Sequence, residues 1–231
     1  MSEGDEKSLP KECKLLSSIL YTSCSFFLAD LHYDRLVASS KSFAWPTPQR
    51  QDFDRALYQA ISTRAHLTLR IRLLCGSDGL FSAEAFSWET VTTDSSWTVL
   101  LDVRPVDADL RLVQHKTTLR EHYEEPVKRL GTSYTAHQEV LLYNKQGLIT
   151  EGTISSIAVR RQGKWITPRV ESGCLAGVMR RCLLNQDMIT EGDIHKDELQ
   201  NGESVIIFNA LRGVLDATLD QGTQKKSVSK S

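Results

Sequence analysis

The sequence predicts an α+β fold in two domains, and three observations carry that prediction. The first half of the chain combines two helical periodicities with alternating strands, and the second half is a run of short strands around one helix. The composition, 40% apolar and 25% charged over 231 residues, is typical of a globular chain with a sizeable core. We therefore expect a small α+β domain at 14–104, a larger domain at 105–219, and flexible polar tails at 1–13 and 220–231.

Two helices are predicted in the first domain, at Leu31–Phe43 and at Gln51–Arg64. In the first helix the 3.6-residue period separates two faces. One face carries Tyr33, Leu36, Val37 and Ser40, and the other carries His32, Arg35 and Ser39. The second helix turns Phe53, Leu57, Ala60 and Ile61 toward the core. The segment Trp45–Pro48, with its two prolines, separates the two helices.

The strands of the first domain follow from apolar runs and alternation. The apolar segment 14–30 is read as one strand, two strands, or a strand followed by a turn. Leu67–Cys75 alternates apolar and basic residues, as a half-buried strand does, and Gly76–Gly79 is a hairpin-type turn. Phe86–Val91 and Trp97–Val103 then complete an antiparallel set.

The second domain is organised around the stretch Glu139–Cys182. This stretch predicts a three-strand meander followed by a helix that begins at Gly177. The meander strands contain Val140–Leu142, Ile154–Val159 and Trp165–Ile166. Two last strands, at 203–209 and 212–218, complete a strand-rich domain with one central helix.

Composition and spacing exclude several classes of function. A net charge of −1 argues against a nucleic-acid partner. No apolar run approaches the ~18 residues that a membrane span needs. The five cysteines show no metal-type spacing, and an odd number without a secretory signal favours reduced, mostly buried thiols in the cytoplasm. The histidines and glutamates of 115–125 do not have the H-E-x-x-H spacing, so no metal site is predicted.

Four features together suggest one kind of chemistry. Lys116 is able to form an imine with an aldehyde, and Glu151 is able to hold a pyridine nitrogen protonated. The helix start at Gly177 offers free N–H groups to a phosphate, and Arg35 adds a guanidinium. These are the requirements of a pyridoxal phosphate site. Each residue also has an ordinary alternative, since Lys116 and Arg35 suit a solvated surface and Glu151 suits an exposed turn.

Several motifs resemble those of the class IV aminotransferase family, the fold-type IV pyridoxal phosphate enzymes. The resemblance runs from about Phe26 to Ala217 and is most specific between 139 and 180. The matching segments are His32–Leu36 for H-x-x-R-L, His115–Thr118 for the lysine segment, Glu151–Ser156 for E-[GT]-T-x-S-N, Trp165–Pro168 for W-x-T-P, and Gly173–Arg180 for G-x-x-x-G-V-x-R. Arg120, His122 and Tyr123 after the lysine, and the ending Asn209–Gly213, look most like the aminodeoxychorismate lyase-like branch, especially its fungal members.

The resemblance implies a small α/β domain, a larger pseudo-barrel domain and a homodimer. It also implies residue roles. Lys116 would bond to the cofactor aldehyde and move the substrate Cα proton, and Glu151 would pair with the pyridine nitrogen. The phosphate would be held by Arg35 with the backbone of Val178 and Met179. Asn209 and Ala210 would close the phosphate and substrate side.

The implied activity is that of a lyase which converts 4-amino-4-deoxychorismate to 4-aminobenzoate, a folate precursor, and pyruvate. A class IV transaminase acting on a branched-chain or D-amino acid is the alternative, because both reactions use the same lysine. A third expectation is a non-catalytic relative, since the glycine-rich segment near the family's N-terminus has a poor match here. Ser156 stands where the family has asparagine, and Met179 where threonine is common.

Overall fold

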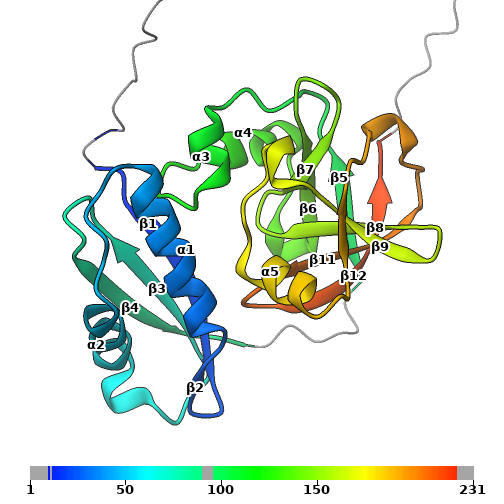
Figure 1. Cartoon of the computed structure of the whole chain (residues 1–231). Helices are drawn as coiled ribbons and strands as arrows, with labels where there is room; N and C mark the ends of the chain where they lie inside the picture. Colours follow the sequence, from blue (N-terminus) through cyan, green and yellow to red (C-terminus); the bar gives the residue numbers. More distant parts are fainter. Residues whose placement is uncertain (1–9, 11, 90–95, 223–231) are drawn as a thin grey trace, which may run out of the picture. The chain divides into compact units, whose positions relative to one another are not determined.

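The computed structural model describes residue 10, residues 12–89 and residues 96–222 (Figure 1). These residues fold into two compact units. The first unit contains the described residues up to Trp88 together with Lys116–Leu119, and the second unit contains the others. The short segment around Lys116 thus belongs to the first unit although the chain on either side of it belongs to the second.

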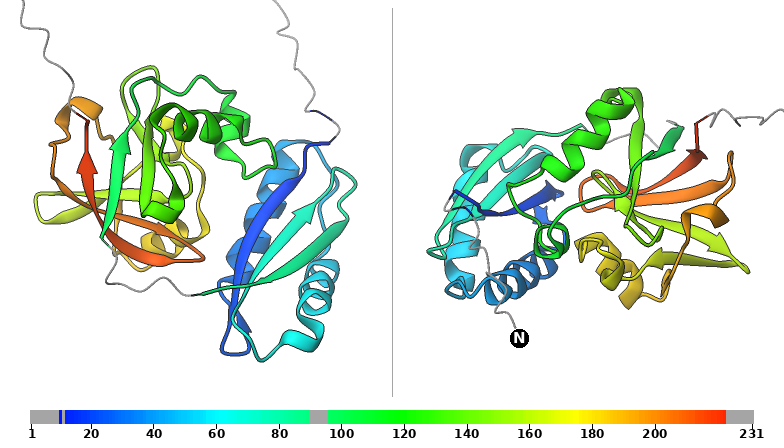
Figure 2. Two further views of the ribbon diagram at one scale, coloured as in Figure 1. Left: turned by 180° about the vertical axis from the view of Figure 1, so that it is seen from behind. Right: turned by 90° about the horizontal axis from the view of Figure 1, so that it is seen from above.

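The first unit is a four-stranded antiparallel sheet with the order β2-β1-β3-β4. Its strands are β1 (Leu15–Thr22), β2 (Ser25–Phe26), β3 (Leu69–Cys75) and β4 (Phe81–Ser87). Two helices, α1 (Ala29–Ser42) and α2 (Arg50–Ile61), cover one face of this sheet (Figure 2). A short 3-10 turn, Ser62–Arg64, follows α2. The two predicted helices are confirmed, and so is the strand at Leu69–Cys75.

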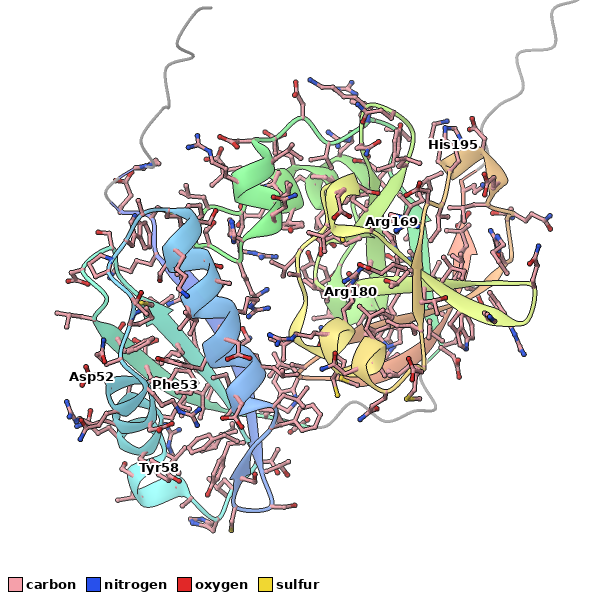
Figure 3. The ribbon with its side chains drawn as sticks, in the orientation of Figure 1. Asp52, Phe53, Tyr58, Arg169, Arg180 and His195 are labelled. Atoms are coloured by element: carbon pink, nitrogen blue, oxygen red, sulfur yellow. The ribbon has the colours of Figure 1, made fainter. Side chains whose placement is uncertain are left out.

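Alternation builds the core of the first unit. Every second residue of β3 is buried, and these side chains meet α1 and α2. Phe53 of α2 is fully buried in this cluster, as its place on the predicted core side required (Figure 3). The inward row of β1 differs, because it includes Ser17, a polar residue with no exposed surface. A buried hydroxyl needs hydrogen-bond partners, and those partners come from α1.

The second unit is built on an eight-stranded mixed sheet with the order β10-β9-β8-β11-β12-β5-β6-β7. Its strands are β5 (Trp97–Leu101), β6 (Gln138–Tyr143), β7 (Ile149–Gly152), β8 (Ser156–Arg161), β9 (Lys164–Pro168), β10 (Thr190–Gly192), β11 (Ser204–Asn209) and β12 (Gly213–Asp220). Its helices are α3 (Leu110–Gln114), α4 (Glu121–Leu130) and α5 (Val178–Asn185). Three 3-10 turns lie at Tyr134–Ala136, Val170–Ser172 and Lys196–Glu198.

The second sheet curls on itself. The end strand β7 connects to β8, on the other side of the sheet, through only three residues, and Gly152 N donates to Ser155 O at 2.8 Å across that turn. The curl of the backbone is visible in Figure 2. Apolar side chains from β5 to β8, β11 and β12 form one buried cluster in this unit. The predicted α+β class with a strand-rich pseudo-barrel is confirmed. The curl fixes the β7–β8 turn, which directly follows the strand that contains Glu151.

Several predicted elements are wrong. Trp97–Leu101 does not join the antiparallel set of the first half but pairs in parallel with β6 and β12. Its alternation shows that one face is buried, but not which sheet it enters. The strand expected at 86–91 is β4, which ends at Ser87, and 90–91 lie outside the described residues. The described part of the second half has three helices and not the single one predicted. The segment of α4 was not predicted as a helix, and it contains Pro126, a residue that usually breaks helices. The helix α3 is only a single turn.

Burial corrects three further points. His32 and Ser39, assigned to the second face of their helix, are both buried. The tails were expected at 1–13 and 220–231, yet Cys13 is buried and Asp220 pairs with Leu100 in the sheet. Residues 1–9, 11 and 223–231 lie outside the described part of the chain. Cys75 and Cys174 are buried as predicted, Cys24 is exposed, and all five cysteines are free thiols.

Two kinds of feature are absent from the described residues. No helix among them has the length and apolar character to cross a membrane. No group of three or more histidine, cysteine, aspartate or glutamate side chains there is arranged to hold a metal ion.

Candidate active site

In the first unit, Lys116 lies on a short segment that pairs with the start of β1. Leu16 N donates to Lys116 O at 2.8 Å, and Thr118 N donates to Lys14 O at 2.9 Å. Thr117 forms an antiparallel bridge with Leu15 and is buried. The backbone of Lys116 is therefore fixed on both sides, and its half-buried side chain starts from a rigid position.

Ser17 links two predicted features of α1. Arg35 Nη2 donates to Ser17 Oγ at 3.1 Å, and His32 Nδ1 lies 3.4 Å from the same oxygen. Because the hydroxyl accepts from Arg35, its own proton is available to His32. Burial, and then the charges of Arg35 and Lys116, hold the pKa of His32 well below its usual 6.5. A neutral histidine thus lies beside two cations, an arrangement that suits an anionic ligand.

In the second unit, Glu151 lies on β7 and is only 5% exposed. The hydroxyl of Tyr123 donates to Glu151 Oε1 at 2.6 Å, and Leu175 N donates to the same oxygen at 3.0 Å. The alternative of an exposed turn carboxylate is therefore wrong. Two donors on one oxygen stabilise the ionised carboxylate and restrict its rotation.

A second carboxylate, Glu139 on β6, supports the turn that follows Glu151. It has no exposed surface, and its Oε1 accepts from Ile154 N at 2.8 Å and from Ser155 N at 2.7 Å. A Cβ at Gly152 would overlap this oxygen, so glycine is required there. Burial raises the pKa of Glu139. The sequence analysis assigned no role to Glu139. The available signal was an acidic residue at the start of an apolar strand.

The start of α5 is the third feature. Its N-cap is Gly177, which has no side chain to cap the helix, and the first N–H groups of an α-helix have no intrahelical partner. A Cβ at Gly177 would lie 2.8 Å from Ser156 Oγ, so the helix start closely approaches the first residue of β8. Val178 is buried and Met179 half-buried. N–H groups at a helix start suit a phosphate, and the predicted role of Val178 and Met179 stays a prediction.

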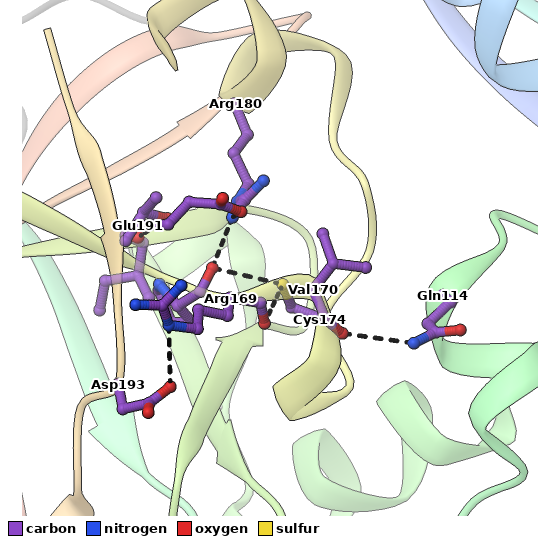
Figure 4. Close-up of polar contacts among 10 residues, drawn as sticks. Gln114, Arg169, Val170, Cys174, Arg180, Glu191 and Asp193 are labelled. Atoms are coloured by element: carbon purple, nitrogen blue, oxygen red, sulfur yellow. Dashed lines mark hydrogen bonds and ion pairs between the residues drawn. The ribbon is translucent and has the colours of Figure 1, made fainter. Parts of the chain in front are cut away.

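The segment between β9 and α5 is held by polar contacts that Figure 4 shows. Arg180, 4% exposed, donates to Pro168 O at 2.6 Å and forms an ion pair with Glu191. Cys174 Sγ donates to Arg169 O at 3.3 Å, and Gln114 Nε2 donates to Val170 O at 3.3 Å. Burial, and then the charge of Glu151, raise the pKa of Cys174 to about 12, so this thiol stays protonated. The contacts fix the chain that presents Leu175 to Glu151.

Asn209 is the last residue of β11, and its side chain contacts the β7–β8 turn. Its Nδ2 donates to Ser155 Oγ at 3.1 Å, and its Oδ1 accepts from Leu211 N and Arg212 N. The asparagine therefore fixes the hairpin that contains Ala210 and connects it to the turn after Glu151. Ala210 is half-buried in that hairpin.

The predicted site residues fall into two groups, one in each unit. The first unit brings together Lys116 and Arg35 around Ser17 and His32. The second unit brings Glu151, the N-terminus of α5 with Val178 and Met179, and the Asn209–Ala210 turn around the β7–β8 connection. Residues that the sequence analysis assigned no site role complete these groups: Ser17, Tyr123, Glu139, Ser155 and Leu175.

Comparison with known proteins identifies the family. The sequence pattern of the amino-transferase class IV family matches residues 15–219 of this chain. The chain belongs to this family. Members depend on pyridoxal phosphate and act on small molecules, so the chain is a pyridoxal phosphate-dependent enzyme. The predicted family, enzyme class and cofactor are confirmed.

Three relatives refine this picture. A Schizosaccharomyces pombe protein provisionally named aminodeoxychorismate lyase is 34% identical over 90% of this chain and 90% of its own. Aminodeoxychorismate lyase of Saccharomyces cerevisiae is 34% identical over 54% of this chain, which is 37% of that protein. A crystal structure from Mesorhizobium loti, provisionally named an amino-acid aminotransferase, has a TM-score of 0.81 and 30% identity, covering 90% of this chain and 100% of that one.

The residues of each unit fit the cofactor. In the first unit, Arg35 and Lys116 beside the neutral His32 suit a phosphate and an aldehyde. In the second unit, the buried carboxylate of Glu151 suits a protonated pyridine nitrogen, and the uncapped start of α5 suits a phosphate. The glycine at 177 leaves room for a close approach to those N–H groups.

Proposed function

We propose that the chain is an aminodeoxychorismate lyase, which converts 4-amino-4-deoxychorismate to 4-aminobenzoate and pyruvate. The observation that carries the proposal is the 34% identity to the Schizosaccharomyces pombe relative over 90% of both chains, because its name specifies this reaction. The Asn209–Gly213 ending, which looks like that of the lyase branch, supports it. The product would be a folate precursor.

The proposed roles follow from the two groups of residues. Bound pyridoxal phosphate supplies an electron sink that makes the proton on the amino-bearing ring carbon removable. Lys116 takes that proton, and the enolpyruvyl ether leaves from the neighbouring carbon. The ring becomes aromatic and the proton ends on the pyruvate methyl group, so the reaction needs neither an oxidant nor water. Glu151 holds the pyridine nitrogen, while Arg35 and the N–H groups of Val178 and Met179 bind the phosphate.

Asn209 and Ala210 would line the phosphate and substrate side. The Asn209 side chain is fully engaged with its own hairpin and with Ser155. Its proposed contribution is therefore to hold the Ala210 backbone in place.

We further propose that the enzyme is cytoplasmic and a homodimer. Five free thiols and a near-neutral charge support the location, and light scattering of the purified protein tests the dimer.

A transaminase is the second candidate, because the Mesorhizobium loti structure is 30% identical and named for that activity. In that reaction Lys116 would move the substrate Cα proton, and an amino group would be exchanged with a keto acid. The two candidates share Lys116, Glu151 and the phosphate contacts, so they differ in products rather than in these residues.

One assay separates the candidates. Purified protein with pyridoxal phosphate is given 4-amino-4-deoxychorismate, and pyruvate and 4-aminobenzoate are measured. We expect both products from the wild type in equal amounts and at least a thousandfold less from Lys116→Ala. The matched control is Lys128→Ala, which removes an exposed lysine paired with Glu124. Amino exchange between an amino acid and a keto acid, with no pyruvate released, would replace the lyase by the transaminase.

A further inference from the structure

The short contact between Tyr123 and Glu151 in the second unit has no role in the family assignment. Tyr123 lies in the first turn of α4 and is 7% exposed, and its ring packs against Val140 and Leu142 of β6. Its hydroxyl reaches Glu151 Oε1 at 2.6 Å, a length typical of a charge-assisted bond. Both partners are nearly fully buried, and such a bond is stronger in the protein interior than in water.

The direction of this bond is fixed. Burial, and then the charge of Glu151, hold the pKa of Tyr123 well above its usual 10, so the phenol keeps its proton and donates. Arg120 fixes the ring from one side. Its guanidinium lies 4.5 Å from the ring centroid, and its Nη2 donates to Thr153 O at 2.9 Å. Tyr123 is thus a rigid donor, and the arginine that packs on its ring is bonded to the turn that follows Glu151.

We propose that Tyr123 is a positioning residue that fixes the Glu151 carboxylate in the ionised state and orientation in which it holds the pyridine nitrogen. This inference rests on the role of Glu151 in the proposed function. Oε1 of Glu151 takes both the Tyr123 hydroxyl and Leu175 N–H, so the carboxylate cannot rotate without losing two donors. Tyr123 acts only through Glu151 and needs no contact with substrate.

The competing explanation is that Tyr123 only fills space beneath α4. A double-mutant cycle separates the two. The variants are Tyr123→Phe, Glu151→Gln and the pair, and the measurement is the equilibrium affinity of each apoprotein for pyridoxal phosphate. We expect Tyr123→Phe to weaken binding roughly tenfold in the wild-type background, the size of a bond to a charged group. In the Glu151→Gln background we expect less than about a twofold effect, because no carboxylate charge remains to be fixed.

Tyr21→Phe is the matched control. Tyr21 is 4% exposed, and its hydroxyl donates to Ala65 O at 3.0 Å, far from Glu151 in the sequence and in the first unit. The Tyr21→Phe variant also loses one hydrogen bond of a buried hydroxyl. Its affinity for pyridoxal phosphate should nevertheless match that of the wild type. Urea unfolding of each apoprotein checks that the variants fold.

Three outcomes would overturn the proposal: equal losses from Tyr123→Phe in both backgrounds, no loss in either, or unchanged affinity of Glu151→Gln. A second readout is the pH dependence of the visible absorbance of the bound cofactor, which Tyr123→Phe should shift and Tyr21→Phe should not. Failure of the lyase assay leaves these measurements intact, because they concern cofactor binding. The proposed function and the role of Tyr123 are therefore tested separately.

Discussion

Glu139 and Glu151 are two buried carboxylates on neighbouring strands of one sheet, and they have different kinds of partners. Glu139 accepts two backbone N–H groups from Ile154 and Ser155, which belong to a single tight turn. Glu151 accepts one side-chain and one backbone donor, from α4 and from the segment before α5. The first carboxylate shapes a local turn, whereas the second joins distant elements. Glu139 therefore serves the fold, whereas Glu151 is the residue to which we assign the cofactor nitrogen in the proposed function.

The two carboxylates also differ in which donors are left without an acceptor when the carboxylate is removed. The turn N–H groups that Glu139 satisfies belong to the half-buried Ile154 and the buried Ser155, and removing the carboxylate would leave a cavity beside them. Its Oε2 is buried without a hydrogen-bond partner among the described residues, which already costs free energy. Glu151 Oε1 is also held by two donors, which an amide oxygen would satisfy at either position, but one of them is a side-chain hydroxyl from α4 and not a turn N–H group. Four predictions on the stability of the second unit test this contrast.

The largest expected effect is that of Glu139→Ala. It leaves the N–H groups of Ile154 and Ser155 unpaired and opens a cavity, so we expect a loss of ~3 kcal/mol or more in the free energy of unfolding. Urea unfolding followed by tryptophan fluorescence measures it, since Trp97 and Trp165 lie in the second unit. Glu139→Gln keeps an acceptor oxygen and should lose no more than ~1 kcal/mol. Equal losses from alanine and glutamine would contradict the role given to Oε1.

Gly152→Ala should follow in size. The new Cβ would overlap Glu139 Oε1, which is fully buried and bonded, so turn and carboxylate must separate. Overpacking of this kind costs ~2 kcal/mol. Gly76→Ala is the matched control, because the nearest atoms there belong to the exposed side chain of Asp78, which is able to move. A Gly152 variant as stable as the Gly76 variant would show that the turn does not depend on this close contact.

The fold was largely predictable from the sequence because periodicity reports burial. The alternation of Leu69–Cys75, the apolar side of α2 and the last two strands all appear where the pattern placed them. Partner choice was not predictable in the same way. Trp97–Leu101 alternates equally well for either sheet, and only long-range pairing with β6 and β12 decides it. A single turn such as α3 is too short to produce a period.

The site was predictable only as far as motifs report chemistry. Lys116, Arg35, Glu151 and the Gly177 helix start carry functional groups that a cofactor requires, so they were named in advance. Supporting residues were not, because their role depends on geometry. Tyr123 follows Lys116 closely in the sequence yet serves Glu151, and Ser17 looked like one polar residue in an apolar strand. No spacing rule connects such pairs before the sheet is folded.

Glu151→Gln should change stability less than either substitution above. The amide oxygen accepts the same bonds from Tyr123 and Leu175 N, so we expect a change below ~1 kcal/mol in the free energy of unfolding. Its affinity for pyridoxal phosphate should nevertheless fall, since the charge that pairs with the pyridine nitrogen is gone. Urea unfolding and cofactor titration on the same preparation check both expectations. A variant that unfolds as easily as Glu139→Ala would mean that Glu151 also serves the fold.

The smallest effect is a pH dependence from Glu139. Burial raises its folded-state pKa above the ordinary 4.5, so the folded protein binds this proton more tightly than the unfolded chain. Stability from this group is then fully present below pH 4.5 and is lost as the pH rises through the folded-state pKa.

The Glu139→Gln variant has no such titrating proton. Its free energy of unfolding relative to wild type should therefore rise with pH above 4.5 and become constant beyond the raised pKa. Urea titrations of both proteins at a series of pH values measure the difference. A relative stability that falls with pH would mean that the ionised carboxylate is favoured by the fold, and Glu139 would then resemble an ion-paired group more than a buried acid.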